Sequence, residues 1–181
     1  MRSNREKRAG GTGRWWLTLA LIVVLAALQW VQQHNFPTRG TSVPGGDVSG
    51  RPQLVDGDSF HMNGDEVRLV GIDAPEGRQS CTRGGTPWPC GEESRRTLAR
   101  LVAGGPVTCR STDRDQHGRL LAVCEAGGRD LNREMVASGM ALAYGNYERE
   151  EAAARAAKRG LWSGEFERPR DWRRQHGRGR E

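Results

Sequence analysis

The sequence predicts an α+β domain whose β-sheet is curled into a small barrel. Three observations support this fold class. Five short segments have the apolar pattern of strands, turn residues separate them, and helical patterns are interleaved in the second half of the chain. Short strands that follow one another closely favour a curled sheet, and helices between and after them are typical of the α+β class. We expect this domain at residues 53–173, followed by a polar tail at residues 174–181.

The first 33 residues predict a membrane anchor. Residues 1–14 carry five basic side chains and one acidic side chain, and residues 15–33 carry no charged side chain. The second stretch is long enough to cross a bilayer as a helix, and tryptophans near both ends suit the two lipid–water interfaces. Because the basic tail should stay in the cytoplasm, we expect a single-pass protein of the inner (cytoplasmic) membrane with its domain outside the cytoplasm. The alternative is a signal peptide cleaved after "VLA" at residues 24–26, which would release a secreted domain.

The next part of the chain predicts a tether and the first strands. Glycine, proline, serine and threonine dominate residues 34–52, which is typical of a flexible linker. Asn63-Gly64 favours a tight hairpin because both residues tolerate positive φ. Pro75 ends the strand pattern, and residues 78–91 show no periodicity, so we expect a loop there. Strands are predicted at residues 53–57, 58–62 and 66–72.

Three helices and two further strands are predicted in the second half. Leu98, Leu101 and Val102 have helical spacing and a Gly-Gly stop follows them. Asn146 is expected to cap the last helix, which should end at Gly160. The helices are predicted at residues 92–105, 130–139 and 147–160, and the strands at 106–111 and 118–126.

The net charge of +6 does not by itself indicate a nucleic-acid-binding protein. Residues 1–14 contribute +4 and residues 164–181 contribute +2, so the residues between them are neutral overall. Membrane orientation already explains the amino-terminal excess. The function must therefore be inferred from a site.

The four cysteines point to disulfides. No pair of them has the two-residue spacing of a zinc knuckle, and the four histidines are scattered along the chain. In an exported domain an even number of cysteines favours disulfides, with three possible connectivities.

Several acidic residues are candidates for a metal site. An EF-hand at Asp56 and Asp58 is excluded because Phe60 stands where a third oxygen ligand is needed. Asp58 and Asp73 each lie next to a turn at the end of a strand, so their carboxylates could meet around a hard cation such as calcium. Taken alone, "DGD" is more typical of turn-forming aspartates.

Two arginines and a glutamate are candidates for catalysis. Arg68 alternates with apolar residues on a predicted strand, and Arg119 begins another apolar strand. Each arginine alone is more typical of an exposed position. Together with Glu76 they suit phosphoryl transfer, because guanidinium groups bind phosphate oxygens in pairs and a carboxylate can orient or deprotonate a water molecule.

Five motifs in order resemble the staphylococcal nuclease, or thermonuclease, family. They are "VDGDSF", "VRLVGIDAPE", "DQHGRLLAV", "DLNREMVASGMALAY" and "AAKRGLW", and the resemblance covers about residues 53–172. It implies a five-stranded OB-fold-like β-barrel with three helices. It also implies calcium-dependent hydrolysis of DNA and RNA.

The resemblance also implies roles for individual residues. Three positions match the catalytic residues of the family, namely Arg68, Glu76 and Arg119. Three match its calcium ligands, namely Asp58, Asp73 and Ala74, where Ala74 replaces a threonine that serves the metal through its backbone carbonyl. Three match positions near the nucleotide: Gln116 stands where the family has lysine, His117 where it has tyrosine, and Tyr144 matches a tyrosine.

The implied fold suggests how the cysteines pair. Cys109 and Cys124 would lie on two strands, almost symmetrically about the turn between them, and could face each other across the hairpin. Cys81 and Cys90 bracket the loop after Glu76. We therefore expect the disulfides Cys81–Cys90 and Cys109–Cys124.

Two functions follow from the sequence as alternatives. The first is a membrane-tethered, calcium-dependent nuclease acting on DNA or RNA outside the cytoplasm, without a protein partner. The second is a non-catalytic OB-fold module that binds nucleic acid or protein at the membrane, since such barrels often only bind.

Overall fold

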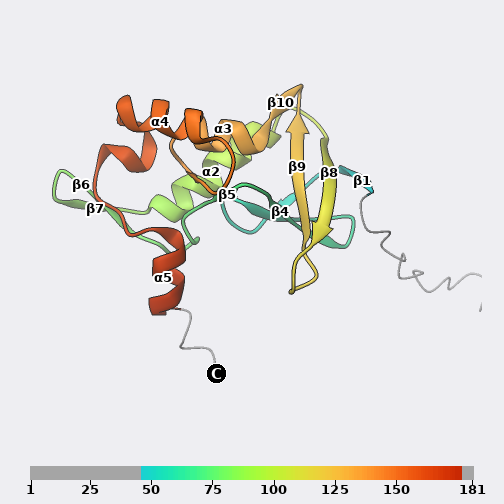
Figure 1. Ribbon diagram of the computed structural model, residues 1–181, viewed down its shortest axis with the longest axis horizontal. Helices are drawn as coiled ribbons and strands as arrows, with labels where there is room; N and C mark the ends of the chain where they lie inside the picture. Colours follow the sequence, from blue (N-terminus) through green and yellow to red (C-terminus); the bar gives the residue numbers. More distant parts are fainter. Residues whose placement is uncertain (1–45, 177–181) are drawn as a thin grey trace, which may run out of the picture. The chain divides into compact units, whose positions relative to one another are not determined.

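The structure is a computed structural model that describes residues 46–176 of the 181-residue chain (Figure 1). The predicted basic tail at 1–14, the anchor at 15–33 and most of the tether at 34–52 lie outside the described residues, as does the end of the polar tail. Within residues 46–176, no helix is both long enough and apolar enough to cross a membrane.

The largest sheet has seven strands in the described part of the chain. Its order is β1 (Asp47–Gly50), β8 (Val107–Arg114), β9 (Leu120–Ala126), β4 (Asp65–Leu69), β3 (Ser59–Met62) and β2 (Gln53–Leu54), with β10 (Arg129–Asp130) also paired to β9. The β4–β9 pair is parallel and the other pairs are antiparallel. The five predicted strands correspond to β2, β3, β4, β8 and β9. The prediction of a flexible tether up to residue 52 does not account for β1, whose backbone pairs with β8.

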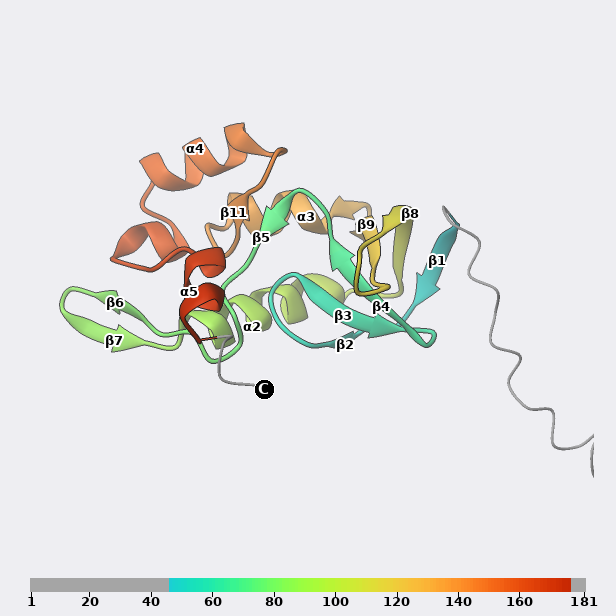
Figure 2. The same cartoon turned by 60° about the horizontal axis from the view of Figure 1, so that its bottom comes forward.

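The sheet is curled into a half-barrel. The β3–β4 turn is the predicted Asn-Gly hairpin, in which Asn63 has φ 55° and Gly64 has φ 90°. The side-chain amide of Asn63 donates a hydrogen bond of 2.9 Å to the carbonyl of Ser49 on β1, so the edge of the sheet meets this turn. The concave side encloses a core that includes Phe60 and Leu98, and helices cover it (Figures 1 and 2).

A bend separates β4 from the next strand. The prediction of one strand over residues 66–72 is wrong, because β4 ends at Leu69 and β5 (Ile72–Asp73) pairs with β11 (Leu142–Ala143) in a separate sheet. Gly71 between them has φ 77°, and a Cβ there would lie 2.9 Å from the amide nitrogen of Asn146. The buried Asn132 donates a hydrogen bond of 2.8 Å to the carbonyl of Val70 and so fixes the bend. The bend carries Asp73 away from the barrel sheet.

Residues 78–91 contain a hairpin rather than the predicted loop. Strands β6 (Cys81–Arg83) and β7 (Thr86–Trp88) pair across a turn at Gly84 and Gly85, both with positive φ. The Gly-Gly pair is a turn signal, but strands of three residues are too short to show a period of two. The hairpin projects from the domain (Figure 2).

Both predicted disulfides are present. Cys81 and Cys90 close the base of the β6–β7 hairpin, with their Cα atoms 5.6 Å apart. Cys109 and Cys124 lie directly opposite each other on β8 and β9, with a Cα–Cα distance of 4.0 Å.

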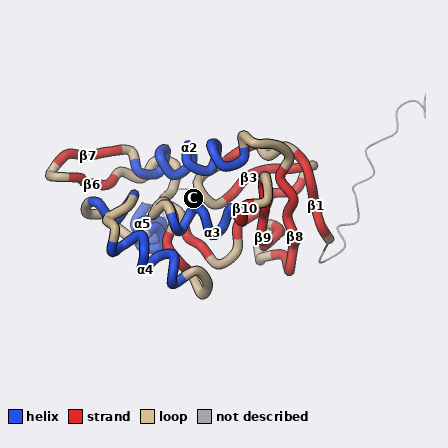
Figure 3. The backbone as a smooth tube through the Cα atoms, turned by 90° about the horizontal axis from the view of Figure 1, so that it is seen from above, coloured by secondary structure: helices blue, strands red, loops and turns tan. Residues whose placement is uncertain are grey.

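Four α-helices occur in the described residues instead of the predicted three (Figure 3). They are α2 (Cys90–Val102), α3 (Leu131–Ala137), α4 (Glu148–Ala156) and α5 (Pro169–His176), and a short 3₁₀ helix spans Gly160–Ser163. The cap residue of α4 is Tyr147, in a left-handed conformation, and not the predicted Asn146. Helix α5 crosses the boundary at residue 173 between the predicted domain and its polar tail.

Candidate active site

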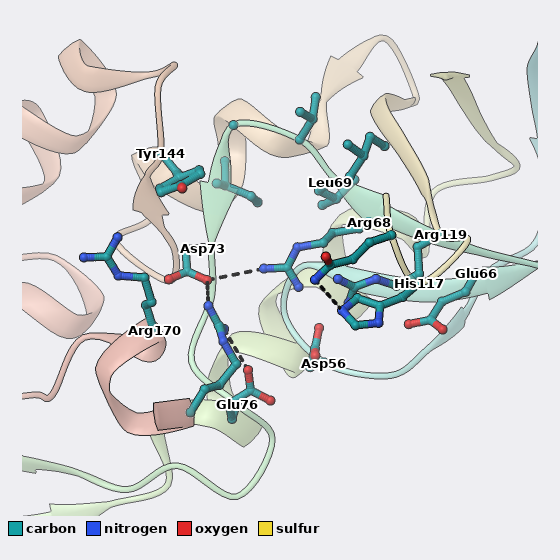
Figure 4. Close-up of a pocket in the computed structure, with 16 residues that line it drawn as sticks. Asp56, Glu66, Arg68, Leu69, Asp73, Glu76, His117, Arg119, Tyr144 and Arg170 are labelled. Carbon is teal, nitrogen blue, oxygen red and sulfur yellow. Dashed lines mark hydrogen bonds and ion pairs between the residues drawn. The ribbon is translucent and has the colours of Figure 1, made fainter. Parts of the chain in front are cut away.

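One cleft of about 830 Å³ collects most of the predicted site residues (Figure 4). A cleft of this size is large enough for a nucleotide-sized ligand. It is bounded by β4, β5, the β8–β9 turn, the residue after β11, and α5. Seven predicted residues line it, namely Arg68, Asp73, Glu76, Gln116, His117, Arg119 and Tyr144. Two arginines of α5 for which no role was predicted, Arg170 and Arg173, line it as well.

Asp58 and Ala74, two of the predicted metal ligands, are buried next to each other and are not among the residues that line this cleft. The Asp58 side chain is buried, and its Oδ2 accepts a hydrogen bond of 2.8 Å from the backbone N–H of Ala74. Burial raises the pKa of Asp58 to about 8, although Arg68 and the Ala74 N–H act in the opposite direction. Asp56 caps the preceding turn by accepting from the backbone N–H of Asp58 at 3.0 Å. Asp56 therefore has the turn-forming role that the sequence suggested for this motif, although it also lines the cleft, whereas Asp58 is connected to the site through its contact with Arg68.

Arg68 is held between two carboxylates. Its Nη2 lies 3.3 Å from Asp58 Oδ2 and 3.3 Å from Asp73 Oδ1. The side chain is 19% exposed, and Figure 4 shows it pointing across the cleft toward Asp73. The structure therefore excludes the solvent-facing position that is usual for a single strand arginine.

Arg173 of α5 joins the other two acidic groups of the cleft. Its Nη1 donates to Glu76 Oε1 and its Nη2 donates to Asp73 Oδ1, each at 2.8 Å. Partial burial acts to lower the pKa of Arg173, but the hydrogen bonds to the two carboxylates outweigh it and raise the pKa, so the guanidinium remains charged. From the sequence, residue 173 was only the predicted end of the domain. No local pattern connects Arg173 with Glu76 and Asp73, which lie 97 and 100 positions earlier in the chain.

Arg119 is oriented by Asp115 in the β8–β9 turn. Arg119 Nε donates to Asp115 Oδ2 at 2.8 Å, and Nη2 lies 2.7 Å from the same oxygen. The other oxygen of Asp115 accepts from the backbone N–H groups of His117 and Arg119. Partial burial acts to raise the pKa of Asp115, but these hydrogen bonds bring it below its ordinary value. Asp115 is thus a further residue at the site without a predicted role.

The rim of the cleft carries the predicted nucleotide-contacting residues. The side chains of Gln116 and His117 are exposed, and their nitrogen atoms lie 3.3 Å apart. Tyr144 is 64% exposed, and its backbone N–H donates to the carbonyl of Gly71 at 2.9 Å. Figure 4 places Arg170 next to Tyr144. The rim therefore offers an aromatic face and a cation to a ligand.

Gln79 organises the loop that carries Glu76. Its side chain is buried, its backbone N–H donates to the carbonyl of Glu76 at 2.7 Å, and its Oε1 accepts from the Glu76 N–H at 3.3 Å. Its Nε2 donates to the carbonyl of Glu167 at 2.7 Å, just before α5. The loop and the start of α5 are therefore tied to the same side chain.

The donor set fits a hard divalent cation. Three acidic side chains, Asp58, Asp73 and Glu76, are in contact with two arginines, Arg68 and Arg173. The cluster has one net negative charge when Asp58 is ionised, a form that its raised pKa disfavours at neutral pH and that a bound cation would favour. Within residues 46–176, no three His, Cys, Asp or Glu side chains are grouped so that they could hold a metal by themselves. Backbone carbonyl and water oxygens would have to complete the shell, which calcium accepts readily.

Comparison with known proteins identifies the family. Residues 66–164, more than half of the chain, match the family model described as staphylococcal nuclease homologue. The chain is 34% identical over 153 residues to succinoglycan biosynthesis protein ExoI of Rhizobium meliloti (strain 1021), covering 80% of this chain and 76% of that protein. It is 35% identical over 129 residues to an uncharacterized endonuclease of Escherichia coli O157:H7, covering 65% of this chain and 78% of that protein.

A plant relative is similar over a shorter part. The probable staphylococcal-like nuclease CAN2 of Oryza sativa subsp. japonica is 36% identical over 115 residues, which is 60% of this chain and 29% of the plant protein. The family model, matched at residues 66–164, spans the cleft residues from Arg68 to Tyr144. The match over residues 66–164 and the similarity to these relatives agree with the half-barrel and with the cleft that holds Arg68 and Arg119, and they show that the chain belongs to the staphylococcal nuclease family.

Proposed function

We propose that this protein is a calcium-dependent nuclease that hydrolyses phosphodiester bonds of DNA or RNA outside the cytoplasm. The observation that carries the proposal is that Arg68, Arg119 and Glu76 line one cleft beside the carboxylates of Asp58 and Asp73. Relatives named as endonucleases or nucleases support the same activity.

The two arginines are suited to bind the reacting phosphate. Their side chains are only 19% and 23% exposed, and carboxylates orient both of them, so little ordering would be needed when the substrate binds. Each planar guanidinium can donate to two phosphate oxygens. These donors would also oppose the negative charge that develops on the phosphate as water attacks in line with the leaving oxygen.

Glu76 is suited to activate the attacking water. Its carboxylate lines the same cleft and is partly exposed, so water can reach it. Only one of its oxygens, Oε1, contacts Arg173. Glu76 would orient the water and accept its proton as the bond to phosphorus forms.

Asp58, Asp73 and the carbonyl of Ala74 are the groups that would hold calcium. When bound, calcium would supply positive charge next to the reacting phosphate. The protein's own contribution is to keep the Asp58 carboxylate buried and attached to the Ala74 backbone at 2.8 Å.

The rim would bind the nucleotides on either side of the reacting phosphate. Tyr144 presents an exposed ring on which a base can stack. Gln116 and His117 can donate hydrogen bonds to phosphate from the β8–β9 turn, without the fixed charge of a lysine.

An extracytoplasmic location completes the proposal. Residues 15–33 would form a single-pass anchor in the inner membrane, or a cleaved signal peptide would release the domain. The disulfides Cys81–Cys90 and Cys109–Cys124 support export, because disulfides persist in oxidising compartments.

The test is a hydrolysis assay of the purified full-length chain. A fluorogenic single-stranded oligonucleotide would be incubated with the protein in calcium and, separately, in excess chelator. We expect cleavage in calcium that stops in chelator. Binding of the oligonucleotide without cleavage under any divalent cation would favour the non-catalytic binding module instead.

A further inference from the structure

We propose that Arg173 is a positioning residue for catalysis, which α5 supplies to hold the Glu76 carboxylate in the orientation that activates water. This inference rests on the proposed nuclease function, and it gives α5 a role in the active site.

The geometry of Arg173 is that of a bridge. Two different nitrogens of one guanidinium donate to carboxylates on two different segments, Glu76 in the loop after β5 and Asp73 on β5 itself, each at 2.8 Å. Because a guanidinium is planar and rigid, these two contacts fix the distance and the relative orientation of the carboxylates. The same Asp73 oxygen also accepts from Arg68 at 3.3 Å, so Glu76 is linked through this bridge to an arginine proposed to bind the phosphate.

Glu76 depends on this contact. Within residues 46–176, Arg173 is the only side chain that forms a hydrogen bond or ion pair with the Glu76 carboxylate. The Glu76 side chain is 28% exposed and lies between β5 and β6, outside regular structure. Without Arg173 the carboxylate would be free to sample several rotamers.

The segment before α5 is attached to the Glu76 loop, which allows Arg173 to act as a fixed support. Thr82 and Glu165 exchange two backbone hydrogen bonds of 2.9 and 2.8 Å. Gln79, which closes the Glu76 loop, donates to the Glu167 carbonyl at 2.7 Å. Pro169, the first residue of α5, is buried. The start of α5 is therefore held against the loop that carries Glu76, and Arg173 adds a further contact between the helix and this loop.

A purely structural role for Arg173 predicts a different outcome. Its side chain is 36% exposed, and ion pairs at such exposure contribute little to stability. Arg174, the next residue, offers a matched control because it is exposed and, among the residues that the structure describes, its ion pair is with Asp171 of the same helix. Loss of Arg173 should therefore change catalysis much more than it changes the melting temperature.

The experiment is a double-mutant cycle on the full-length chain, with kcat, KM and melting temperature measured for each variant. We expect Arg173→Ala to lower kcat by about 10- to 100-fold with KM nearly unchanged, as is common when a partner that orients a functional group is removed. Arg173→Lys should recover part of the loss, because one ammonium can reach only one of the two carboxylates. Arg174→Ala should behave like the wild type.

The cycle is completed with Glu76→Gln. If Arg173 acts through Glu76, adding Arg173→Ala to Glu76→Gln should cause no further fall in kcat. Three results would overturn the inference. A rise in KM alone for Arg173→Ala would make Arg173 a phosphate-binding residue, and an increase in kcat would make it an inhibitory contact. Fully additive effects of Arg173→Ala and Glu76→Gln on kcat would show that Arg173 does not act through Glu76. An inactive wild type would instead refute the proposed function, so the two failures are distinguishable.

Discussion

Replacing Arg68 with lysine separates a phosphate-binding arginine from a structural one. Lysine keeps the positive charge beside the buried Asp58 but loses the planar pair of donors. Alanine would be a poorer choice, because leaving Asp58 buried without its partner can cost about 3–5 kcal/mol of folding free energy. The lysine variant should therefore remain folded, with a melting temperature close to that of the wild type.

The expected loss of turnover follows from the position of the guanidinium. Arg68 Nη2 lies 3.3 Å from both Asp58 and Asp73, on the wall of the cleft, and its side chain is only 19% exposed. In a position shielded from solvent, removing one donor to the transition state lowers kcat by a factor on the order of 10²–10³, which corresponds to about 2.7–4 kcal/mol. We therefore predict a fall of this size for Arg68→Lys.

The assay is steady-state cleavage of an oligonucleotide in calcium. Arg110→Lys is the matched control, because Arg110 also lies on a strand and contacts a carboxylate on the neighbouring strand, Glu125, at 3.1 Å, but is 67% exposed and outside the cleft. The control should keep wild-type kcat. Turnover within about threefold of the wild type in Arg68→Lys would mean that this arginine does not contact the reacting phosphate, since the expected loss is far larger.

Two further predictions concern the metal site and a tyrosine. Asp58→Asn should weaken calcium binding at least about tenfold, as measured by calorimetry. It should not lower the free energy of unfolding, because the amide places no charge in the buried site. Unchanged calcium affinity would show that Asp58 is not a metal ligand. Burial, together with the nearby Asp130, raises the pKa of Tyr147 from 10.0 to about 12. Because this pKa is higher in the folded state, the free energy of unfolding should fall as the pH rises from about 10 to about 12. In a Tyr144→Phe variant, which leaves Tyr147 as the remaining tyrosine, phenolate absorbance should have its midpoint near 12, and a midpoint at the ordinary value would contradict the contact with Asp130.

Local signals in the sequence were sufficient for the centre of the fold. Asn63-Gly64 forms the predicted hairpin. The cysteines of β8 and β9 pair as the fold implied by the family resemblance suggested. The bend at Gly71 was not predicted, because "EVRLVGI" has the pattern of one continuous strand and the contact with Asn146 that requires glycine comes from a distant segment. Helix α5 was missed because "PRDWRRQH" has too few apolar residues to show a helical period.

The site could be predicted only where its residues follow a family motif. Arg68 and Glu76 lie in one such motif and line the cleft as expected. Asp115 lies in the same motif as Arg119, but a carboxylate near an arginine is common in any turn and does not by itself indicate an orienting contact. Arg173 lies outside every motif and contacts Glu76 across 97 positions. The contact of Arg173 depends on tertiary packing, which no local motif encodes.

The most direct measurement of the central claim is the turnover of Glu76→Gln on an oligonucleotide in calcium. Glutamine keeps the shape of the side chain but cannot accept a proton from water, so we predict a loss of kcat on the order of 10²–10⁴ with the fold intact. Glu125→Gln, which alters an arginine-paired glutamate outside the cleft, should leave kcat unchanged. Equal turnover of the wild type and Glu76→Gln would contradict the assignment of water activation to this cleft.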